Sequence, residues 1–163
     1  MDHMIYLSLG TNQGDREGNL EAVQHHLPVA VNVLECSPIY ETPPWGYDNQ
    51  PTFLNQVVKG ETKLSPEDLL FYLKAVEKKM GRVPTFRYGP RIIDIDILFY
   101  DELVFDNSNL VIPHPRLEGR AFVLVPLSDL APDLRHTVLG KTVKELLNET
   151  DTSGISLYKR TNV

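Results

Sequence analysis

Hydrophobic positions along the chain follow two patterns, one typical of strands and one typical of helices. Runs of apolar and β-branched residues indicate strands, and apolar residues spaced three or four apart indicate helices. In chain order they predict a strand, a helix, two strands, a helix and a strand, over residues 4–9, 15–27, 29–41, 53–59, 65–80 and 92–100. This βαββαβ order predicts an α+β, ferredoxin-like fold, in which both helices pack on one face of an antiparallel sheet.

Two loops and a C-terminal extension complete this pattern. Residues 42–52 and 82–91 are rich in Pro, Gly and polar side chains, which favour irregular loops. After residue 100 we expect a short hairpin at about 103–112, an apolar stretch at 122–130 that Pro126 interrupts, and an amphipathic helix at 142–147.

Composition and charge narrow the class of protein. The 163 residues suit a single domain over 1–163, and a hydrophobic fraction of 42% is ordinary for a globular chain. Sixteen basic and 22 acidic residues leave a net charge of −6, which argues against nucleic acid as a general partner because phosphate backbones attract basic proteins. With the single cysteine Cys36, and no visible signal sequence or membrane-spanning run, we expect a cytoplasmic monomer without a membrane partner.

Two acids lie in the otherwise aliphatic strand over 92–100. Side chains alternate between the faces of a strand, so Asp94 and Asp96 are expected on one face, with α-carbons about 6.6 Å apart. The opposite face is expected to take Ile93, Ile95, Ile97 and Phe99. Two carboxylates at this spacing can both reach a pair of Mg²⁺ ions, which prefer oxygen ligands. The alternative is a strand with a solvated outer face.

The loop before this strand is basic, although the protein is acidic. Residues 82–91 contain Arg82, Arg87 and Arg91 and no acid. The planar guanidinium group suits phosphate oxygens. A basic loop that leads into an Asp-x-Asp strand favours a polyphosphate site, with arginines on the oxygens and carboxylates on the metals. The alternative is a basic loop that is only solvated.

Two further segments carry weaker signals. His114, Arg116 and Arg120 fall within seven residues and could contact a phosphate or a ribose, although a His flanked by prolines is also typical of a turn. Phe53 and Asn55 combine an aromatic ring with an amide, which suits a flat heterocycle. Taken alone, Phe53 is better explained by core packing and Asn55 by a contact in a turn.

Together, the spaced motifs resemble those of the 6-hydroxymethyl-7,8-dihydropterin pyrophosphokinases of folate biosynthesis. The motifs are Leu9-Gly10-Thr-Asn12, Tyr40-Glu-Thr42-Pro43-Pro44, Gln50-Pro-x-Phe53-Leu-Asn55, Tyr88-Gly-Pro-Arg91-x-x-Asp94-x-Asp96, Pro113-His114-Pro and Gly119-Arg120-Ala-Phe122. The resemblance covers about residues 4–135. It implies a ferredoxin-like fold, in agreement with the order of the predicted elements.

The resemblance also implies an activity and a set of site residues. The family transfers pyrophosphate from ATP to the pterin hydroxymethyl group and releases AMP. By this resemblance Asp94 and Asp96 would hold two Mg²⁺ ions, and the catalytic arginines Arg82 and Arg91 would bind the triphosphate. The other implied ATP contacts are Glu77, Ile97, His114 and Arg120. The implied pterin contacts are the stacking rings of Phe53 and Phe122, and Asn55 with the backbone around Thr42, Pro43 and Trp45.

Some positions depart from the pattern common in the family. Tyr88 stands where many members have Trp, Val83 and Pro84 follow Arg82 where a further basic residue is frequent, and Lys74 stands where Gln is frequent. These departures bear on the details of triphosphate binding and leave the implied activity intact. We expect the loops at 42–52 and 82–91 to close on ATP and exclude water.

Two other functions account for some of the same residues. A Mg²⁺-dependent nucleotidyltransferase also uses Asp-x-Asp on a strand, but it gives no role to Phe53, Asn55 and Phe122. A non-catalytic ferredoxin-like binding module gives no role to paired acids beside three arginines. The residues also leave the proton acceptor open between Asp96 and water.

Overall fold

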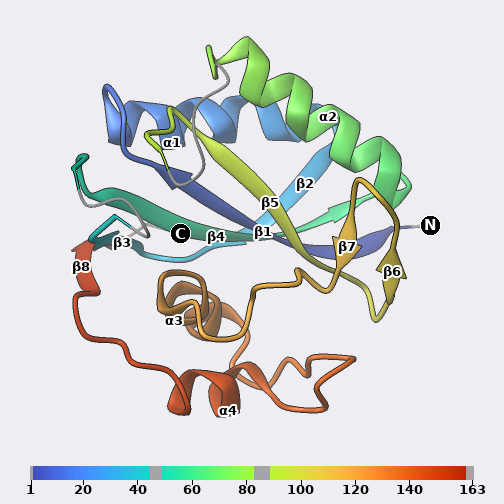
Figure 1. Cartoon of the computed structure of the whole chain (residues 1–163). Helices are drawn as coiled ribbons and strands as arrows, with labels where there is room; N and C mark the ends of the chain where they lie inside the picture. The colour runs from blue at the N-terminus through green and yellow to red at the C-terminus, as the bar shows by residue number, and fades with distance from the viewer. Residues whose placement is uncertain (1, 45–48, 83–88, 161–163) are drawn as a thin grey trace.

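An antiparallel sheet with helices on both faces forms the framework of the protein (Figure 1). The computed structural model describes residues 2–44, 49–82 and 89–160. The elements are β1 (His3–Thr11), α1 (Arg16–His26), η1 (Leu27–Val29), β2 (Val31–Cys36), β3 (Ile39–Thr42), β4 (Phe53–Thr62), α2 (Pro66–Lys79), β5 (Asp94–Tyr100), β6 (Phe105–Asp106), β7 (Val111–Ile112), α3 (Ala121–Leu130), α4 (Val143–Asn148) and β8 (Ser156–Lys159).

The order of the strands confirms the predicted ferredoxin-like arrangement. The sheet runs β5-β1-β4-β3-β8, and β2 also pairs with β4. The predicted strand over 29–41 is divided into β2 and β3 at Ser37 and Pro38, because proline has no N–H for the ladder. The Ser37 hydroxyl accepts the N–H of Val57 at 2.9 Å, so that strand β4 keeps a partner at the break.

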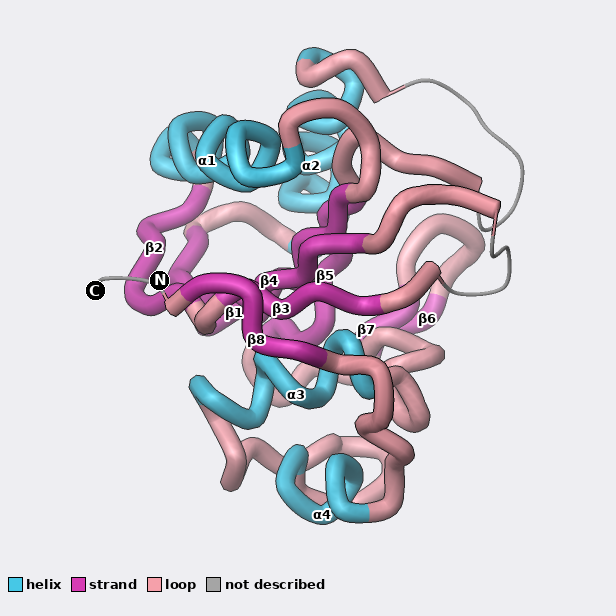
Figure 2. The backbone as a smooth tube through the Cα atoms, turned by 90° about the vertical axis from the view of Figure 1, so that its left-hand side faces the viewer, coloured by secondary structure: helices cyan, strands magenta, loops and turns pink. Residues whose placement is uncertain are grey.

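Helices α1 and α2 cover one face of the sheet, as predicted, while α3 lies on the other face and α4 packs against α3, which Figure 2 shows from the side. Residues Asp15 and Ser65 cap α1 and α2 by accepting N–H bonds from their first turns. The prediction that Pro126 interrupts the stretch at 122–130 was wrong, because α3 continues through it. Burial of apolar neighbours such as Leu124 against the sheet outweighs the single backbone bond that proline removes.

The alternation along β5 holds as far as Ile97 and then changes. A β-bulge opposite Tyr6 and Leu7 inserts Leu98, so that Leu7 pairs with Ile97 and Tyr6 pairs with Phe99. Phe99 therefore lies on the α3 side, and its predicted place beside Ile97 was wrong. The predicted places of Asp94, Asp96 and the three isoleucines before the bulge are confirmed.

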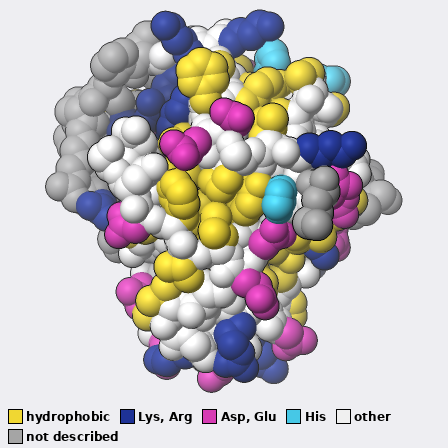
Figure 3. Space-filling model, turned by 90° about the vertical axis from the view of Figure 1, so that its right-hand side faces the viewer, with side chains coloured by type: hydrophobic (Ala, Val, Ile, Leu, Met, Phe, Trp, Pro, Cys, Tyr) yellow, Lys and Arg dark blue, Asp and Glu magenta, His cyan; other side chains and the backbone are white. Residues whose placement is uncertain are grey.

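The surface mixes charged and apolar side chains. On the face in Figure 3, acidic and basic side chains are interspersed around hydrophobic ones. No helix among the described residues has the length and apolar character that a membrane crossing requires. The short hairpin of β6 and β7 and the helix α4 confirm two further predictions. Strand β8, which follows them, was not predicted.

Candidate active site

A cavity of about 240 Å³ lies on the α3 side of the sheet. Gly10 of β1 sits between Asp94 of β5 and Asn55 of β4 in the strand registers, so these three residues form one row across the sheet. A β-carbon on Gly10 would meet the Asn55 side-chain oxygen at 3.4 Å, and glycine here keeps the cavity floor open. The described lining residues are Ser8, Gly10, Thr42, Pro43, Phe53, Asn55, Gly89, Arg91, Asp94, Asp96, Arg116, Arg120 and Phe122.

The paired acids lie in this cavity with arginines beside them. Arg82 contacts Asp94 Oδ1 through Nη2 at 2.9 Å and through Nε at 3.1 Å, and Arg91 Nε lies 3.6 Å from the same oxygen. Burial and then the charge of Asp96 raise the pKa of Asp94, and the two arginines oppose this shift. The site therefore combines a repelling carboxylate pair with fixed positive charge.

These residues fit a metal that is shared with a phosphate ligand. Among the described residues, no group of three or more His, Cys, Asp or Glu side chains is placed to hold a metal ion. Asp94 and Asp96 supply only part of a coordination sphere. Mg²⁺ commonly keeps several waters and takes one or two carboxylates together with phosphate oxygens. The donor set thus suits a magnesium–phosphate complex better than a closed metal site.

One side of the cavity is aromatic and bears a buried amide. Asn55 is 6% exposed, and its Nδ2 donates to the Thr42 hydroxyl at 2.8 Å. Phe53 and Phe122 both line the cavity, and the Arg120 guanidinium lies 5.5 Å from the centre of the Phe122 ring. An aromatic pair beside partnered polar groups suits a flat, polar heterocycle. Trp45, predicted to belong here, lies outside the described residues.

A second cavity, of about 260 Å³, lies at the edge of the sheet along β5. Ile97 and His114 line it, together with Lys74 of α2 and the turn at 107–111. Burial lowers the pKa of His114, and the positive charges of Arg120 and Arg116 lower it further against the pull of Asp96. Asp96 lines both cavities. The predicted ATP residues are thus divided, with Ile97 and His114 here and Arg91 and Arg120 in the first cavity.

Glu77 lies apart from the described lining of both cavities. Its side chain is buried, with the residue 2% exposed, and its Oε2 accepts the backbone N–H of Ile95 at 2.7 Å. Its Oε1 lies 3.2 Å from Lys74 Nζ, and burial raises its pKa. Because Ile95 stands between the two acids, Glu77 joins α2 to the strand that carries them. Its contact with ATP stays a prediction.

Asn12 is a site residue to which sequence reasoning gave no role. It is 1% exposed. Its backbone N–H donates to the Arg91 carbonyl at 3.0 Å, and its Oδ1 accepts the Arg91 N–H at 2.8 Å. Its Nδ2 donates to Gln50 Oε1 at 2.8 Å and to the Pro51 carbonyl at 3.0 Å. Asn12 therefore joins the two predicted loops, whose residues Arg87 and Tyr88 lie outside the described part. Its membership of a family motif was the only signal in the sequence.

Comparisons with known proteins agree with this geometry. Residues 6–132 match the family model of 7,8-dihydro-6-hydroxymethylpterin-pyrophosphokinase. The chain is 44% identical over 152 residues to a 2-amino-4-hydroxy-6-hydroxymethyldihydropteridine pyrophosphokinase of Methylorubrum extorquens, covering 92% of this chain and 95% of the relative. The Bacillus subtilis protein of the same name is 38% identical over 162 residues, covering 98% and 93%.

Longer proteins contain a similar region. The chain is 43% identical to the folic acid synthesis protein fol1 of Schizosaccharomyces pombe over 95% of its own length, and it spans about a fifth (21%) of that relative. The wild-type HPPK-DHPS structure of Plasmodium falciparum matches with a TM-score of 0.74 and 19% identity, over 91% of this chain and 45% of the other. This structural likeness supports the fold.

Proposed function

The chain belongs to the 7,8-dihydro-6-hydroxymethylpterin-pyrophosphokinase family, and from this premise we propose that it carries out the pyrophosphokinase step of folate biosynthesis. It transfers pyrophosphate from ATP to the hydroxymethyl group of 6-hydroxymethyl-7,8-dihydropterin and gives the pterin diphosphate and AMP. The observation that carries this proposal is the position of Asp96, which lines both cavities. Two substrates can therefore meet across one acidic strand.

The pterin occupies the cavity of about 240 Å³. The rings of Phe53 and Phe122 stack on its two faces, and Asn55 and the backbone near Thr42 bind its polar edge. The buried Asn55–Thr42 hydrogen bond supports this role, because it fixes the orientation of the amide before the ligand binds. Pro43 lines the same cavity. We propose Trp45, which lies outside the described residues, as a further pterin contact because the family resemblance implies it.

ATP extends from the second cavity toward the paired acids. Its base and ribose lie near Ile97 and His114, and Glu77 holds β5 in place behind them. Arg82, Arg91 and Arg120 bind the triphosphate. Asp94 and Asp96 hold two Mg²⁺ ions, which neutralise phosphate charge when bound. The arginines that already contact Asp94 support a site prepared for phosphate.

The reaction needs positioning and charge neutralisation more than covalent help from the protein. The pterin hydroxyl oxygen attacks the β-phosphorus, the bond from that phosphorus to the bridging α–β oxygen breaks, and AMP leaves with the electron pair. The hydroxyl proton passes to Asp96 or to water. We propose, as the sequence predicts, that the loops at 42–52 and 82–91 close on ATP and exclude water; residues 45–48 and 83–88 of these loops lie outside the described part of the chain.

Product analysis tests this function. The chain is incubated with ATP, Mg²⁺ and the hydroxymethyl pterin, and we expect pterin diphosphate and AMP in equal amounts. A nucleotidyltransferase would release free pyrophosphate, and a binding module would give no turnover. Either result, or the formation of ADP, contradicts the proposal.

We further propose that residues 1–163 form one pyrophosphokinase domain, which acts as a monomer in the cytoplasm on small-molecule substrates. The position of Asp96 in the lining of two cavities of one chain supports the monomer, since no second copy is needed to bring this acid to both. Light scattering at enzyme assay concentration checks it, and a dimer mass would contradict the monomer.

A further inference from the structure

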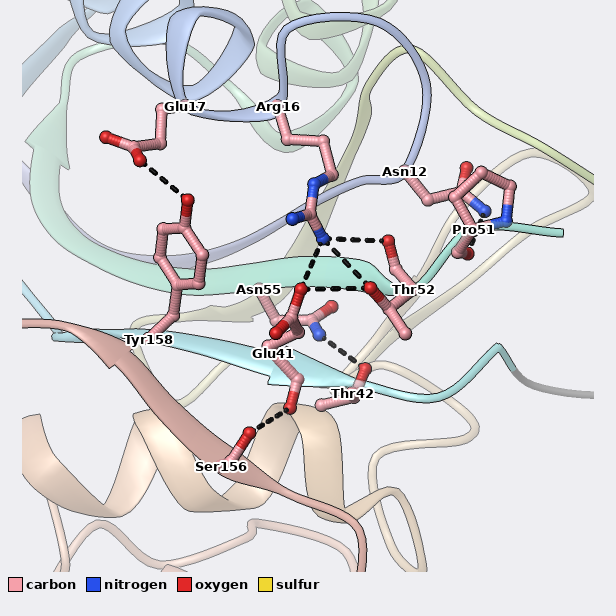
Figure 4. A network of polar contacts seen from close by, with 10 residues as sticks. All are labelled: Asn12, Arg16, Glu17, Glu41, Thr42, Pro51, Thr52, Asn55, Ser156 and Tyr158. Atoms are coloured by element: carbon pink, nitrogen blue, oxygen red, sulfur yellow. Dashed lines mark hydrogen bonds and ion pairs between the residues drawn. The ribbon is translucent and has the colours of Figure 1, made fainter.

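Three residues behind the pterin cavity form a closed triangle of polar contacts (Figure 4). Arg16 Nη1 lies 2.7 Å from Glu41 Oε2 and donates to the hydroxyl and the carbonyl oxygen of Thr52 at 3.0 and 3.1 Å. The Thr52 hydroxyl donates in turn to Glu41 Oε2 at 2.9 Å. These bonds hold the pKa of the Glu41 carboxyl below its usual range. The triangle joins α1, β3 and the residue before β4.

Two residues of the triangle, Glu41 and Thr52, are each next in sequence to a proposed pterin contact. Glu41 precedes Thr42, and Thr52 precedes Phe53. Thr42 and Phe53 are direct partners in the β3–β4 ladder at its open end. None of the three triangle residues is among the described residues that line the cavity. Their most direct route to the ligand is therefore through the neighbouring Thr42–Phe53 pair.

The last strand supports the triangle from outside. The Arg16 guanidinium lies 5.7 Å from the centre of the Tyr158 ring on β8, and the Tyr158 hydroxyl donates to Glu17 Oε1 at 2.7 Å. Ser156 Oγ donates to the Glu41 carbonyl at 3.4 Å. Charge-assisted hydrogen bonds and a cation–π contact on one guanidinium limit its rotamers. The Arg16 guanidinium is thus held by Glu41 and Thr52 through hydrogen bonds and by the Tyr158 ring through the cation–π contact. Ion pairs near a protein surface are usually less constrained.

We propose that Arg16 and Glu41, bridged by Thr52, are positioning residues that set the separation of Thr42 and Phe53 and thereby the affinity for the pterin. This inference rests on the proposed function, because it takes the pterin as the ligand of that cavity. The second cavity shares no residue with the triangle. Because the base and ribose of ATP are proposed to lie in that second cavity, we expect ATP binding to change less than pterin binding.

Equilibrium binding of each substrate to single variants tests this role. Arg16→Met removes the donors at similar length, and we expect it to weaken pterin binding about tenfold and to change ATP binding less than about twofold. Arg16→Lys keeps one charged donor and restores part of the loss. Thr52→Val removes the bridging hydroxyl but leaves the Arg16–Glu41 ion pair and the bond to the Thr52 carbonyl, and we expect it to repeat the pattern. Thr52→Ser keeps the hydroxyl and should resemble the unmodified chain.

The control variant is Lys141→Met, which breaks the exposed Lys141–Glu149 pair of 2.8 Å far from the site. It should leave both affinities unchanged. Equal weakening of ATP and pterin by Arg16→Met, or unchanged pterin binding in both Arg16→Met and Thr52→Val, would overturn the positioning role. If the unmodified chain binds the pterin but forms no pterin diphosphate, the proposed function fails, and the binding ratios still decide the role of the triangle.

Discussion

The two cavities on either side of Asp96 are built in different ways. The proposed pterin cavity rests on three hydrogen-bonded strands, and its buried amide is already paired with Thr42. The nucleotide cavity lies at the sheet edge, where a turn at 107–111 and the half-exposed Lys74 form much of its lining. Strand ladders fix positions more tightly than turns do. We infer that the pterin side supplies shape selectivity, while the nucleotide side adapts to its ligand.

Removing Asp94, which lines the first cavity, or Asp96, which lines both, should have the largest effect. We expect Asp94→Asn or Asp96→Asn to lower turnover by about 100-fold or more, because a metal-bound charge contributes several kcal/mol to the transition state. Thermal unfolding should change little. Asp106→Asn, at an exposed hairpin acid, serves as the control in the same steady-state assay. Turnover near that of the unmodified chain in both variants would remove the acids from the site.

The aromatic wall distinguishes the two cavities most clearly. Phe122→Ala removes a ring that lines only the pterin side, so we expect pterin affinity to fall about 30-fold, a loss of about 2 kcal/mol in apolar contact. ATP affinity should stay within about twofold. Phe71→Ala, at a ring that is 80% exposed on α2, is the matched control. Calorimetric titration measures both ligands, and equal losses would argue against a stacking role.

Asn12 should give an intermediate effect that reaches both substrates. Asn12→Ala removes three of its four bonds, those that hold Gln50, Pro51 and the Arg91 N–H. We expect kcat to fall about tenfold and both KM values to rise, because Gln50 and Pro51 of one loop lose their bonds to Asn12 and Arg91 of the other keeps only one of two. The exposed Asn32→Ala provides the comparison. A change confined to one substrate would show that the two loops are positioned independently.

Glu77 should give the smallest effect, and it concerns stability. Its pKa is raised in the folded chain, so folding stability decreases as pH rises from the unfolded-state pKa through the folded one. Glu77→Gln removes that titration and can still accept the Ile95 N–H. Urea unfolding at pH 4.5 and 7.5 measures the free energy of unfolding of both chains. We expect that of the variant, relative to the unmodified chain, to be higher at pH 7.5 than at pH 4.5. A difference between variant and unmodified chain that is independent of pH would contradict this.

Local patterns in the sequence predicted the first half of the fold well and the last part less well. Apolar residues between positions 4 and 100 follow regular strand and helix patterns. The elements β1, α1, β4, α2 and β5 accordingly lie close to their predicted ranges. Strand β8 was missed because Ser156–Lys159 is exposed and gains its structure only by pairing with β3. The bulge at Leu98 arises from the pairing of β5 with β1, so the pattern of apolar residues along β5 alone does not predict it.

The site shows the same division between local and long-range information. The place of Asp94 and Asp96 on one face follows from alternation alone. The roles of Phe53 and Phe122 come from family motifs, since an isolated Phe is equally typical of a core. Contacts such as Arg16 with Glu41 and Thr52 join segments 25 and 36 residues apart, and only the folded chain brings them together.

The fate of the terminal phosphates tests the account most directly. In a single turnover with excess enzyme, ATP carries phosphorus-32 at the γ-position in one reaction and at the α-position in another. We predict that the γ-label moves wholly to the pterin and that the α-label stays wholly in AMP, because the proposed transfer is an attack at the β-phosphorus. A γ-label found in free phosphate or pyrophosphate, or an α-label found on the pterin, would contradict the proposed transfer.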